Sequence, residues 1–404
     1  MEDLLLLVHR IPYPPNKGDK IRSYHLLRHL AQHYRVHLGC FIDDADDWQH
    51  VPRVSQWCAS THFARLSAVP ARLRSLAALL GGQSLSCGYY RHAGMRDWVA
   101  QTMQAHAVGR ILVFSSAMAQ YVRAYPQARR VVDFVDVDSD KWRQYATRKA
   151  APMRWLYAHE ARRLLAFERR VAQDCDAALF VSAPEAQLFR QLAPESAAKT
   201  GFFSNGVDTA YFTPAAGGAN PFSADEHAIV FTGAMDYWPN VDAVQWFAAE
   251  VLPALRAGQP RAVFWIVGAR PTPAVQQLAA LPGVRVSGTV PDVRPYLAHA
   301  AVCVAPLRVA RGIQNKVLEA MAMAQTVLVS PQALEGIDAA PGRELLLAEG
   351  ALQFQAALSQ ALLAPDAAIG RAARTAVEQR YSWDSNLAGV DQLLEAAVPL
   401  RRKA

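Results

Sequence analysis

The sequence contains little cysteine and no motif that would pair it. The five cysteines are single and widely separated, and no Cys-x-x-Cys pair is present, which argues against a zinc site. The odd number and the spacing instead predict reduced thiols, as in a cytoplasmic protein. The cysteines are Cys40, Cys58, Cys87, Cys175 and Cys303.

Long apolar runs and several familiar catalytic motifs are also missing. No stretch approaches the ~20 apolar residues that a membrane span needs. The start, MEDLLLLVHR, has only a short apolar run preceded by acidic residues, which does not fit a secretory signal. We therefore expect any membrane contact to be peripheral. The absence of a Gly-x-Ser-x-Gly elbow and of a Walker A sequence argues against Ser-His-Asp catalysis and a P-loop.

The composition is that of an ordinary folded chain. Hydrophobic residues make up 52% and charged residues 19% of the sequence, so disorder is not expected. The 404 residues exceed what one hydrophobic core usually serves, which predicts two domains of about 200 residues each. The net charge of +7 suits anionic partners such as phosphates, nucleic acid or an anionic membrane surface, without choosing among them.

Short apolar runs alternate with helical segments along the chain. Residues 4–9 and 35–42 are predicted strands that flank a Pro/Gly loop and a helix at 21–33. This strand–loop–helix–strand unit is how a doubly wound parallel sheet begins. Further strands of this first series are predicted at 110–114, 130–135 and 177–182.

A second series of the same kind follows the Asn-Gly-Val-Asp stretch at Asn205. The segment 215–226 has the weakest pattern and is a candidate linker between domains. The chain thus predicts two α/β domains in tandem. The strands of the second series are predicted at 228–232, 262–267, 284–287, 301–305 and 326–330.

The strongest chemical signal is the stretch VAPLRVARGIQNKVLEAMAMAQTVLVS. A strand ends at Pro306, a loop carries Arg311 and Gly312, and a helix with Lys316 and Glu319 follows. Gly312 permits close backbone approach, and the helix start offers free N–H groups to an anion beside two cationic side chains. The carboxylate of Glu319 can accept two hydrogen bonds from a ribose. A nucleoside diphosphate fits this pattern, and a solvated basic loop before a core helix fits it equally.

This stretch resembles the nucleotide-binding signature of the retaining family 4 glycosyltransferases, which have the GT-B fold. Members often carry two glutamates, the second within a Leu-Glu-Ala-Met-Ala helix. Glu319 matches the second glutamate, whereas the position of the first is occupied by Arg311. The resemblance implies that Glu319 binds the ribose of the donor. It also implies that the preceding loop binds the donor, through Gly312, Ile313, Gln314 and Asn315.

Other stretches resemble the same family. Phe-Thr-Gly-Ala-Met at Thr232 and Gly233 resembles the first strand and loop of the donor domain, where backbone N–H groups approach the phosphates. Many members have Arg and Lys near this loop, but this chain does not, so Arg311 and Lys316 would meet the phosphate charge. The segment ending at Val290 resembles the lining of the base pocket. Asn-Gly-Val-Asp resembles the crossover between domains, although Asn-Gly also explains a simple turn.

In the first domain, a loop rich in proline and charge joins the first strand to the first helix. Gly18 would let the backbone sit close to a ligand, and Lys17, Lys20 and Arg22 could meet phosphate on the donor or acceptor. A solvated turn explains the same residues.

An acidic stretch follows the predicted strand at 130–135, and ligands of open α/β sheets lie at such strand ends. We take Asp136 as the first and Asp133 as the second catalytic candidate. Asp138 or Ser139 is better explained as a helix N-cap. Carboxylates alone can bind a divalent metal, but the resemblance implies that neither a metal nor another cofactor is needed.

Two further features leave the function open. The basic helical segment around 153–170 suits either an anionic membrane surface or an ordinary amphipathic helix. The clustered histidines show no metal-motif spacing on one predicted element, so surface or satisfied core positions are expected. These histidines are His9, His25, His29, His33 and His37.

The resemblance implies a GT-B protein with two Rossmann-like, doubly wound parallel-sheet domains facing across a cleft. Residues 1–205 would bind the acceptor and 206–380 the nucleotide sugar, with 381–404 packing back on the first domain. The implied reaction is transfer of a sugar, with retention, to a saccharide or lipid-linked glycan. The chain also resembles the sugar transferases of PEP-CTERM and exopolysaccharide clusters. A sugar-nucleotide epimerase and a non-catalytic binding protein remain alternatives, whereas no motif supports nucleic-acid binding.

Overall fold

The computed structural model describes residues 1–15, 18–147, 150–310 and 313–396. Contacts divide the chain into two compact units. Unit 1 contains residues 1–204 together with residues from Leu387 onward, and unit 2 contains Asn205–Asn386. The stretch 215–226, predicted as a linker, lies inside unit 2.

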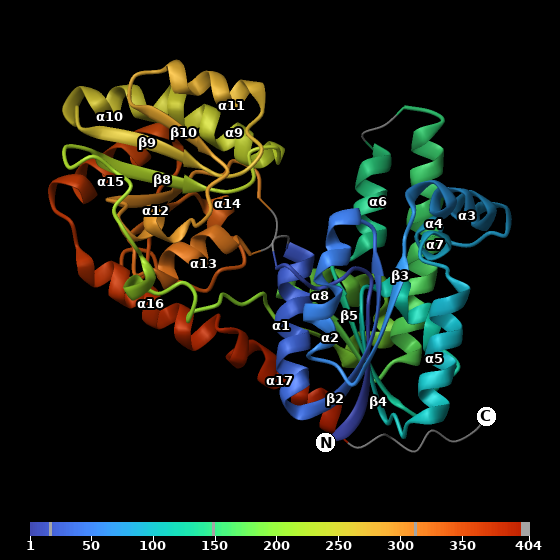
Figure 1. Ribbon diagram of the computed structural model, residues 1–404. Helices are drawn as coiled ribbons and strands as arrows, with labels where there is room; N and C mark the ends of the chain where they lie inside the picture. Colours follow the sequence, from blue (N-terminus) through green and yellow to red (C-terminus); the bar gives the residue numbers. More distant parts are fainter. Residues whose placement is uncertain (16–17, 148–149, 311–312, 397–404) are drawn as a thin grey trace. The chain divides into compact units, whose positions relative to one another are not determined.

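Unit 1 is built on a seven-stranded sheet in which every pair of neighbouring strands is parallel (Figure 1). The strand order is β3-β2-β1-β4-β5-β6-β7, which is the doubly wound arrangement. The strands are β1 (Glu2–Val8), β2 (Tyr34–Ile42), β3 (Ser60–Arg65), β4 (Arg110–Phe114), β5 (Arg129–Val135), β6 (Ala177–Phe180) and β7 (Thr200–Phe202).

Helices cover both faces of this sheet, so its strands are apolar on both sides. Leu5 and Leu7 of β1 pack in the same cluster as residues of α5 and α7, while α1 lies on the other face (Figure 1). The helices are α1 (Gly18–His33), α2 (Val51–Ser55), α3 (Ala68–Leu80), α4 (Leu85–Tyr89), α5 (Ala93–Ala105), α6 (Asp138–Thr147), α7 (Met153–Asp174) and α8 (Ala183–Leu192). The short 3-10 helix η2 (Ser116–Tyr121) follows β4.

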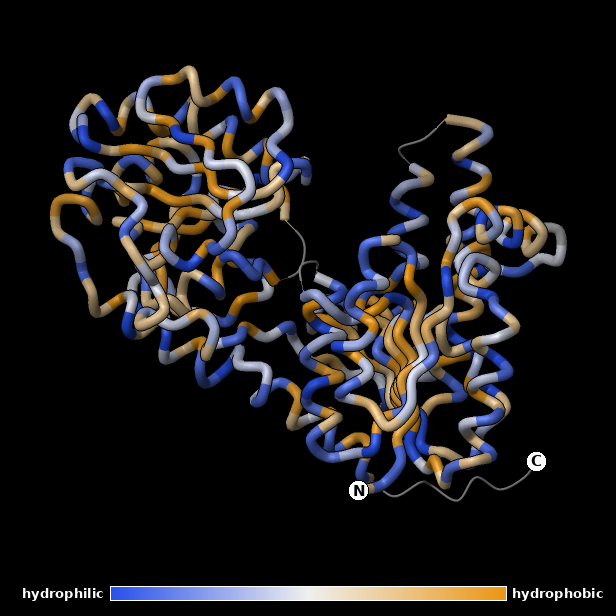
Figure 2. Tube along the Cα trace, in the orientation of Figure 1, coloured by the Kyte–Doolittle hydropathy of each residue, from blue (hydrophilic) through white to orange (hydrophobic). Residues whose placement is uncertain are grey.

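Unit 2 repeats this architecture with a six-stranded parallel sheet of order β10-β9-β8-β11-β12-β13. Figure 2 shows that the strands of both units are among their most hydrophobic segments, as buried parallel strands should be. The strands are β8 (His227–Thr232), β9 (Ala262–Val267), β10 (Val284–Gly288), β11 (Val302–Ala305), β12 (Val327–Val329) and β13 (Leu346–Leu347).

The helices of unit 2 connect these strands and then run on to the end of the chain. They are α9 (Trp238–Trp246), α10 (Leu252–Gly258), α11 (Pro273–Gln277), α12 (Arg294–Ala298), α13 (Asn315–Ala322), α14 (Pro331–Leu334), α15 (Gly350–Leu363) and α16 (Ala367–Arg380). The last helix, α17 (Trp383–Glu395), contributes residues to both units. The prediction of two doubly wound parallel-sheet domains is confirmed.

The C-terminal half of α17 is fixed on unit 1 by polar contacts. Asp391 accepts a hydrogen bond from Nε2 of His29 at 2.7 Å, and Nε of Arg110 donates to the carbonyl of Leu394 at 3.0 Å. At the other end of the helix, the ring of Trp383 packs against Gly206 so closely that a Cβ there would lie 2.8 Å from Cδ2. Gly206 is therefore needed for this contact.

Candidate active site

The candidate donor site of unit 2 starts where its strands end. β8 ends at Thr232, which pairs with Val267, the last residue of β9. Gly233 follows Thr232, and Gly268 follows Val267. A Cβ on Gly268 would lie 1.7 Å from the carbonyl oxygen of Gly233, so this close backbone approach excludes any side chain. The carboxyl ends of parallel strands are where open α/β sheets bind ligands.

Lys316 from the first turn of α13 reaches this strand end. Its Nζ lies 4.2 Å from the ring centroid of Phe231, and a Cβ built on Gly233 would be 3.1 Å from it. Nζ donates a hydrogen bond to Oδ1 of Asn240, whose amide donates to the carbonyl of Ala234 at 2.9 Å. Asn240 is buried and thus holds the ammonium group against the loop that follows β8.

The two ionisable groups of α13 have strongly shifted pKa values. Burial lowers the pKa of Lys316 to about 7, although the charge of Glu319 works in the opposite direction. Burial likewise raises the pKa of Glu319 to about 7, against the effect of Lys316. Both side chains keep part of their surface exposed. Ionisable groups with shifted pKa values that remain accessible to a ligand at a strand end are typical of functional sites.

The shifted pKa of Lys316 allows a test of the nucleoside diphosphate site that the sequence predicts here, with UDP as the probe and proton uptake as the expected result. A diphosphate beside Nζ favours the ammonium form, so the pKa of Lys316 should rise from about 7 when UDP binds. At pH 8, where free Lys316 is mostly neutral and Glu319 already ionised, uptake should approach about one proton per UDP. The slope of calorimetric binding enthalpy against buffer ionisation enthalpy measures this uptake. A K316M variant should show almost none, and equal uptake by both proteins would contradict the assignment.

The exposed ring of Tyr211 interacts electrostatically with Glu319. The charge of Glu319 contributes, after burial and Asp292, to raising the pKa of Tyr211. The guanidinium of Arg294 stacks 4.0 Å above the Tyr211 ring and pairs with Asp292 at 2.6 Å. Tyr211 and Asn240 are site residues that the sequence did not reveal, because neither belongs to a recognisable motif.

The remaining predicted donor residues of unit 2 are placed as follows. Thr232 and Pro306 are buried, whereas Val290 and Ile313 are half-buried and pack against the core. Gln314 precedes α13 as its N-cap, and Oδ1 of Asn315 is buried without a hydrogen-bond partner among the described residues. The predicted site residues Lys17, Arg311 and Gly312 lie outside the residues that the structure describes.

In unit 1, two neighbouring strands end in strained backbone. Val135 at the end of β5 has φ of 71° and Ser115 after β4 has φ of 78°. A left-handed φ is costly for a β-branched residue and is concentrated at functional sites. Asp136 follows directly, and its carboxylate accepts a hydrogen bond from Nζ of Lys141 at 2.6 Å. The first catalytic candidate is therefore half-exposed at a strained strand end.

The second catalytic candidate is placed differently from the prediction. Asp133 is 1% exposed, and its two oxygens accept hydrogen bonds from Nε and Nη2 of Arg22 at 2.8 and 3.2 Å. This burial corrects the prediction, since such a carboxylate stabilises the interior and has no free oxygen to offer a substrate.

The predicted phosphate contacts of Lys20 and Arg22 are also wrong. Lys20 is buried and pairs with Asp47 at 2.7 Å. Arg22 donates hydrogen bonds to Asp133 and to the carbonyl of Phe203. Gly18 begins α1, and a Cβ on it would meet no atom of the described residues within 4 Å.

His9, expected to be an ordinary surface or core histidine, lies where β1 ends in unit 1. It follows β1, its ring stacks on Phe114 at 5.6 Å, and its Nε2 lies 3.3 Å from Oδ2 of Asp19. Burial alone would raise the pKa of Asp19, but the hydrogen bond from His9 and the charge of Arg10 lower it far below its usual range. His9 thus lies at the same edge of the sheet as Asp136.

Two groups of described residues have ligand atoms close enough for a metal ion. In the first, Asp3, His37 and His106, both ring nitrogens of His37 are already engaged by Asp3 and Ser60. The second is formed by His29, His33 and Asp391. We expected no metal-motif spacing among these histidines on one element. His29 and His33 are, however, four residues apart on α1, which places them on one face of the helix.

The comparison with known families matches part of unit 2. Residues 226–364, all within unit 2, match the family described as glycosyl transferases group 1. No curated protein sequence matches the chain significantly.

Solved structures match nearly the whole chain. Sucrose-phosphate synthase (tll1590) from Thermosynechococcus elongatus has a TM-score of 0.68 at 19% identity, with 97% of this chain and 98% of that chain covered. Anabaena Alr3699/HepE in complex with UDP has a TM-score of 0.66 at 14% identity, with 98% and 100% covered. The fold is GT-B. The lipopolysaccharide glycosyltransferase WaaG has the same fold, with a TM-score of 0.62 at 14% identity and 98% and 100% covered.

These neighbours also include a ligand complex relevant to the donor site. The Anabaena protein has been solved with UDP-glucose as well as with UDP. At these identities the likeness establishes the GT-B fold of this chain. Among the residues that the structure describes, no helix combines the length and the apolar character needed to cross a membrane.

Proposed function

We propose that this protein is a retaining hexosyltransferase that moves a sugar from a nucleoside diphosphate sugar to an acceptor hydroxyl. The observation that carries the proposal is the meeting of Lys316, Glu319 and the backbone at Gly233 where the strands of unit 2 end. Unit 2 would bind the donor and unit 1 the acceptor. UDP-glucose bound to the Anabaena neighbour makes a UDP-sugar the first donor to test.

The proposed chemistry needs only groups that the chain provides. The bond between the anomeric carbon and the diphosphate breaks, and the acceptor oxygen forms the new bond on the same face of the sugar. The acceptor proton passes to a phosphate oxygen of the departing nucleoside diphosphate. Lys316 and backbone N–H groups stabilise the charge on that leaving group, and the sequence adds Arg311 and Gly312 to this role. Glu319 holds the ribose, and Asp136 orients the acceptor.

Lysine and N–H groups can supply the positive charge of the donor site, so we propose that no metal or other cofactor is required. We further place the enzyme in glycosyltransferase family 4, among the transferases of PEP-CTERM and exopolysaccharide clusters, on the strength of the Lys-Val-Leu-Glu-Ala-Met-Ala motif. The acceptor would be a saccharide or lipid-linked glycan in exopolysaccharide or glycolipid assembly. The protein would act in the cytoplasm, peripherally at the inner membrane, without binding nucleic acid.

Sugar transfer is tested directly by incubating the protein with a panel of nucleotide sugars and lipid-linked or free saccharide acceptors. We expect one donor to give a glycosylated acceptor whose anomeric coupling in proton NMR equals that of the donor. An inverted product would contradict the retaining mechanism. Donor turnover without any glycosylated acceptor would identify an epimerase or hydrolase instead.

A further inference from the structure

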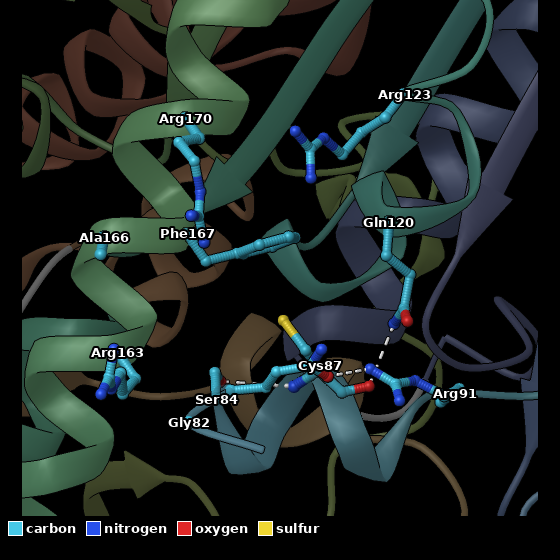
Figure 3. A pocket seen from close by; sticks show the side chains of 11 residues that line it. Gly82, Ser84, Cys87, Arg91, Gln120, Arg123, Arg163, Ala166, Phe167 and Arg170 are labelled. Carbon is cyan, nitrogen blue, oxygen red and sulfur yellow. Dashed lines mark hydrogen bonds between the residues drawn. The ribbon is translucent and has the colours of Figure 1, made fainter. Parts of the chain in front are cut away.

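A basic hollow in unit 1 is lined by none of the strand-end residues described above. Its volume is about 400 Å³, and α4, η2 and α7 provide its walls. Figure 3 shows Arg163 and Arg170 on α7 on one side and Arg91 and Arg123 on the other. Four arginines thus surround one cavity, which we call the arginine pocket.

The floor of the arginine pocket is firmly built, and no carboxylate is among the described residues that line it. Ser84, Cys87 and Phe167 are buried there, and burial raises the pKa of the Cys87 thiol to about 12, so it carries no charge. Glu160 of α7 accepts hydrogen bonds from Ser84 and from the backbone N–H of Ser86 at 2.8 and 3.0 Å, which fixes α4 to α7. The walls are therefore held in place without a ligand.

The four arginines of the pocket have few carboxylate partners of their own. Only Arg123, 3.5 Å from Asp174, has an ion-pair partner among the described residues, whereas none is found there for Arg91, Arg163 or Arg170. Like charges gathered around one hollow repel each other, and a bound anion removes this cost. Arginine's planar fork matches phosphate oxygens in pairs.

An apolar stripe lies on the helix that leads into this pocket. Val69, Leu73 and Leu76 of α3 are 68%, 63% and 52% exposed and occupy one face at spacings of four and three residues. The opposite face packs on α4, where a Cβ on Gly88 would lie 2.7 Å from that of Ala78. Exposed apolar side chains next to a basic cluster are typical of a helix at a membrane surface.

The N-terminal turn of α7 has the same character. Met153 and Trp155 are 40% and 58% exposed there, two turns before Arg163. Tryptophan is favoured where an apolar region meets water. We propose that the arginine pocket binds the phosphate or diphosphate head group of an anionic lipid, with the α3 stripe in the adjoining apolar layer of the membrane. This site goes beyond sugar transfer and does not depend on it.

The α7 helix offers a matched control for this proposal. Arg162 and Arg169 precede the two pocket arginines by one position each, carry the same charge and do not line the pocket. The double variants R163Q/R170Q and R162Q/R169Q therefore lower the net charge equally. Leu352 and Leu363 of unit 2, 81% and 73% exposed, provide the control for the apolar stripe.

The test is flotation of the full chain with vesicles of phosphatidylcholine containing one-quarter phosphatidylglycerol. R163Q/R170Q should weaken vesicle binding about 10- to 30-fold, because each basic residue near an anionic membrane contributes about 1 kcal/mol to binding. L73S/L76S should also weaken vesicle binding. R162Q/R169Q and L352S/L363S should change it less than about 3-fold. Equal losses of vesicle binding in the two double arginine variants would overturn the proposal, since the net positive charge alone would then explain binding.

A second arm separates lipid from soluble phosphate. If glycerol phosphate or pyrophosphate stabilised the wild type but not R163Q/R170Q, and vesicles did not bind, the lipid proposal would be overturned. Nucleotide binding provides the last comparison: R163Q/R170Q should bind UDP as the wild type does. Loss of vesicle binding and failure of the donor site are therefore distinguishable results.

Discussion

Replacing Lys316 with methionine is expected to lower kcat/KM for sugar transfer by about 10²- to 10³-fold, the loss typical of removing one donor that stabilises an oxyanion. Asn240 and the ring of Phe231 hold the ammonium group beside Gly233, where the diphosphate is proposed to lie. Methionine has a similar length but neither the charge nor the hydrogen-bond donors. Initial rates with the donor identified in the panel measure the effect.

The control for this variant is the loss of a charge nearby but outside the site. Arg308 precedes Arg311 and Gly312 in the sequence, is exposed and pairs with Asp242. R308M should therefore change kcat/KM by less than about 3-fold, since exposed ion pairs contribute little. If K316M retained more than half of the wild-type rate, or if both variants lost the same activity, Lys316 would not stabilise the leaving group.

Replacing Arg22 with methionine is expected to lower the free energy of unfolding of unit 1 by about 3–5 kcal/mol, because Asp133 is left as a buried, unpaired charge. Both side chains are 1% exposed, and Arg22 also donates to the carbonyl of Phe203 at 3.0 Å while stacking 3.5 Å from its ring centroid. Hydrogen exchange of the β5 amides in the full chain, measured as urea is increased, reports this loss.

Two further variants show whether the charge or the packing is responsible. The double variant R22M/D133L should regain much of the lost stability, since an apolar pair can replace a buried ion pair. R169M removes one partner of the exposed pair with Glu195 and should leave the unfolding transition nearly unchanged. Losses below 1 kcal/mol for both R22M and D133A would contradict a structural role for this pair.

The sequence predicted the parallel sheets well because their central strands are short apolar runs. β1, β8 and β11 are buried on both faces, and such runs between turn signals are hard to mistake. β3 was missed because its sequence, STHFAR, is mostly polar and half-buried. β13 has only two residues, too few for any pattern to indicate a strand.

The candidate sites were predictable only where the residues are close in sequence. Lys316 and Glu319 share one helix turn, so their chemistry could be inferred from spacing alone. Asn240 lies 76 residues from Lys316 and became visible only through the hydrogen bond between them. In the same way, Lys20 and Arg22 look like solvated cations in the sequence, but their carboxylate partners lie 27 and 111 residues away and draw them into the interior.

UDP binding measured by isothermal titration calorimetry, with the wild type and with Glu319→Ala, tests the central claim most directly. We expect the wild type to bind UDP and, at 100 times Kd, to be stabilised by about 2.7 kcal/mol. We expect E319A to bind at least about 10-fold more weakly, because the ribose hydroxyls lose a charged acceptor worth about 1.5–3 kcal/mol. Unchanged affinity in E319A, or no binding of any nucleoside diphosphate by the wild type, would contradict a donor site built on α13.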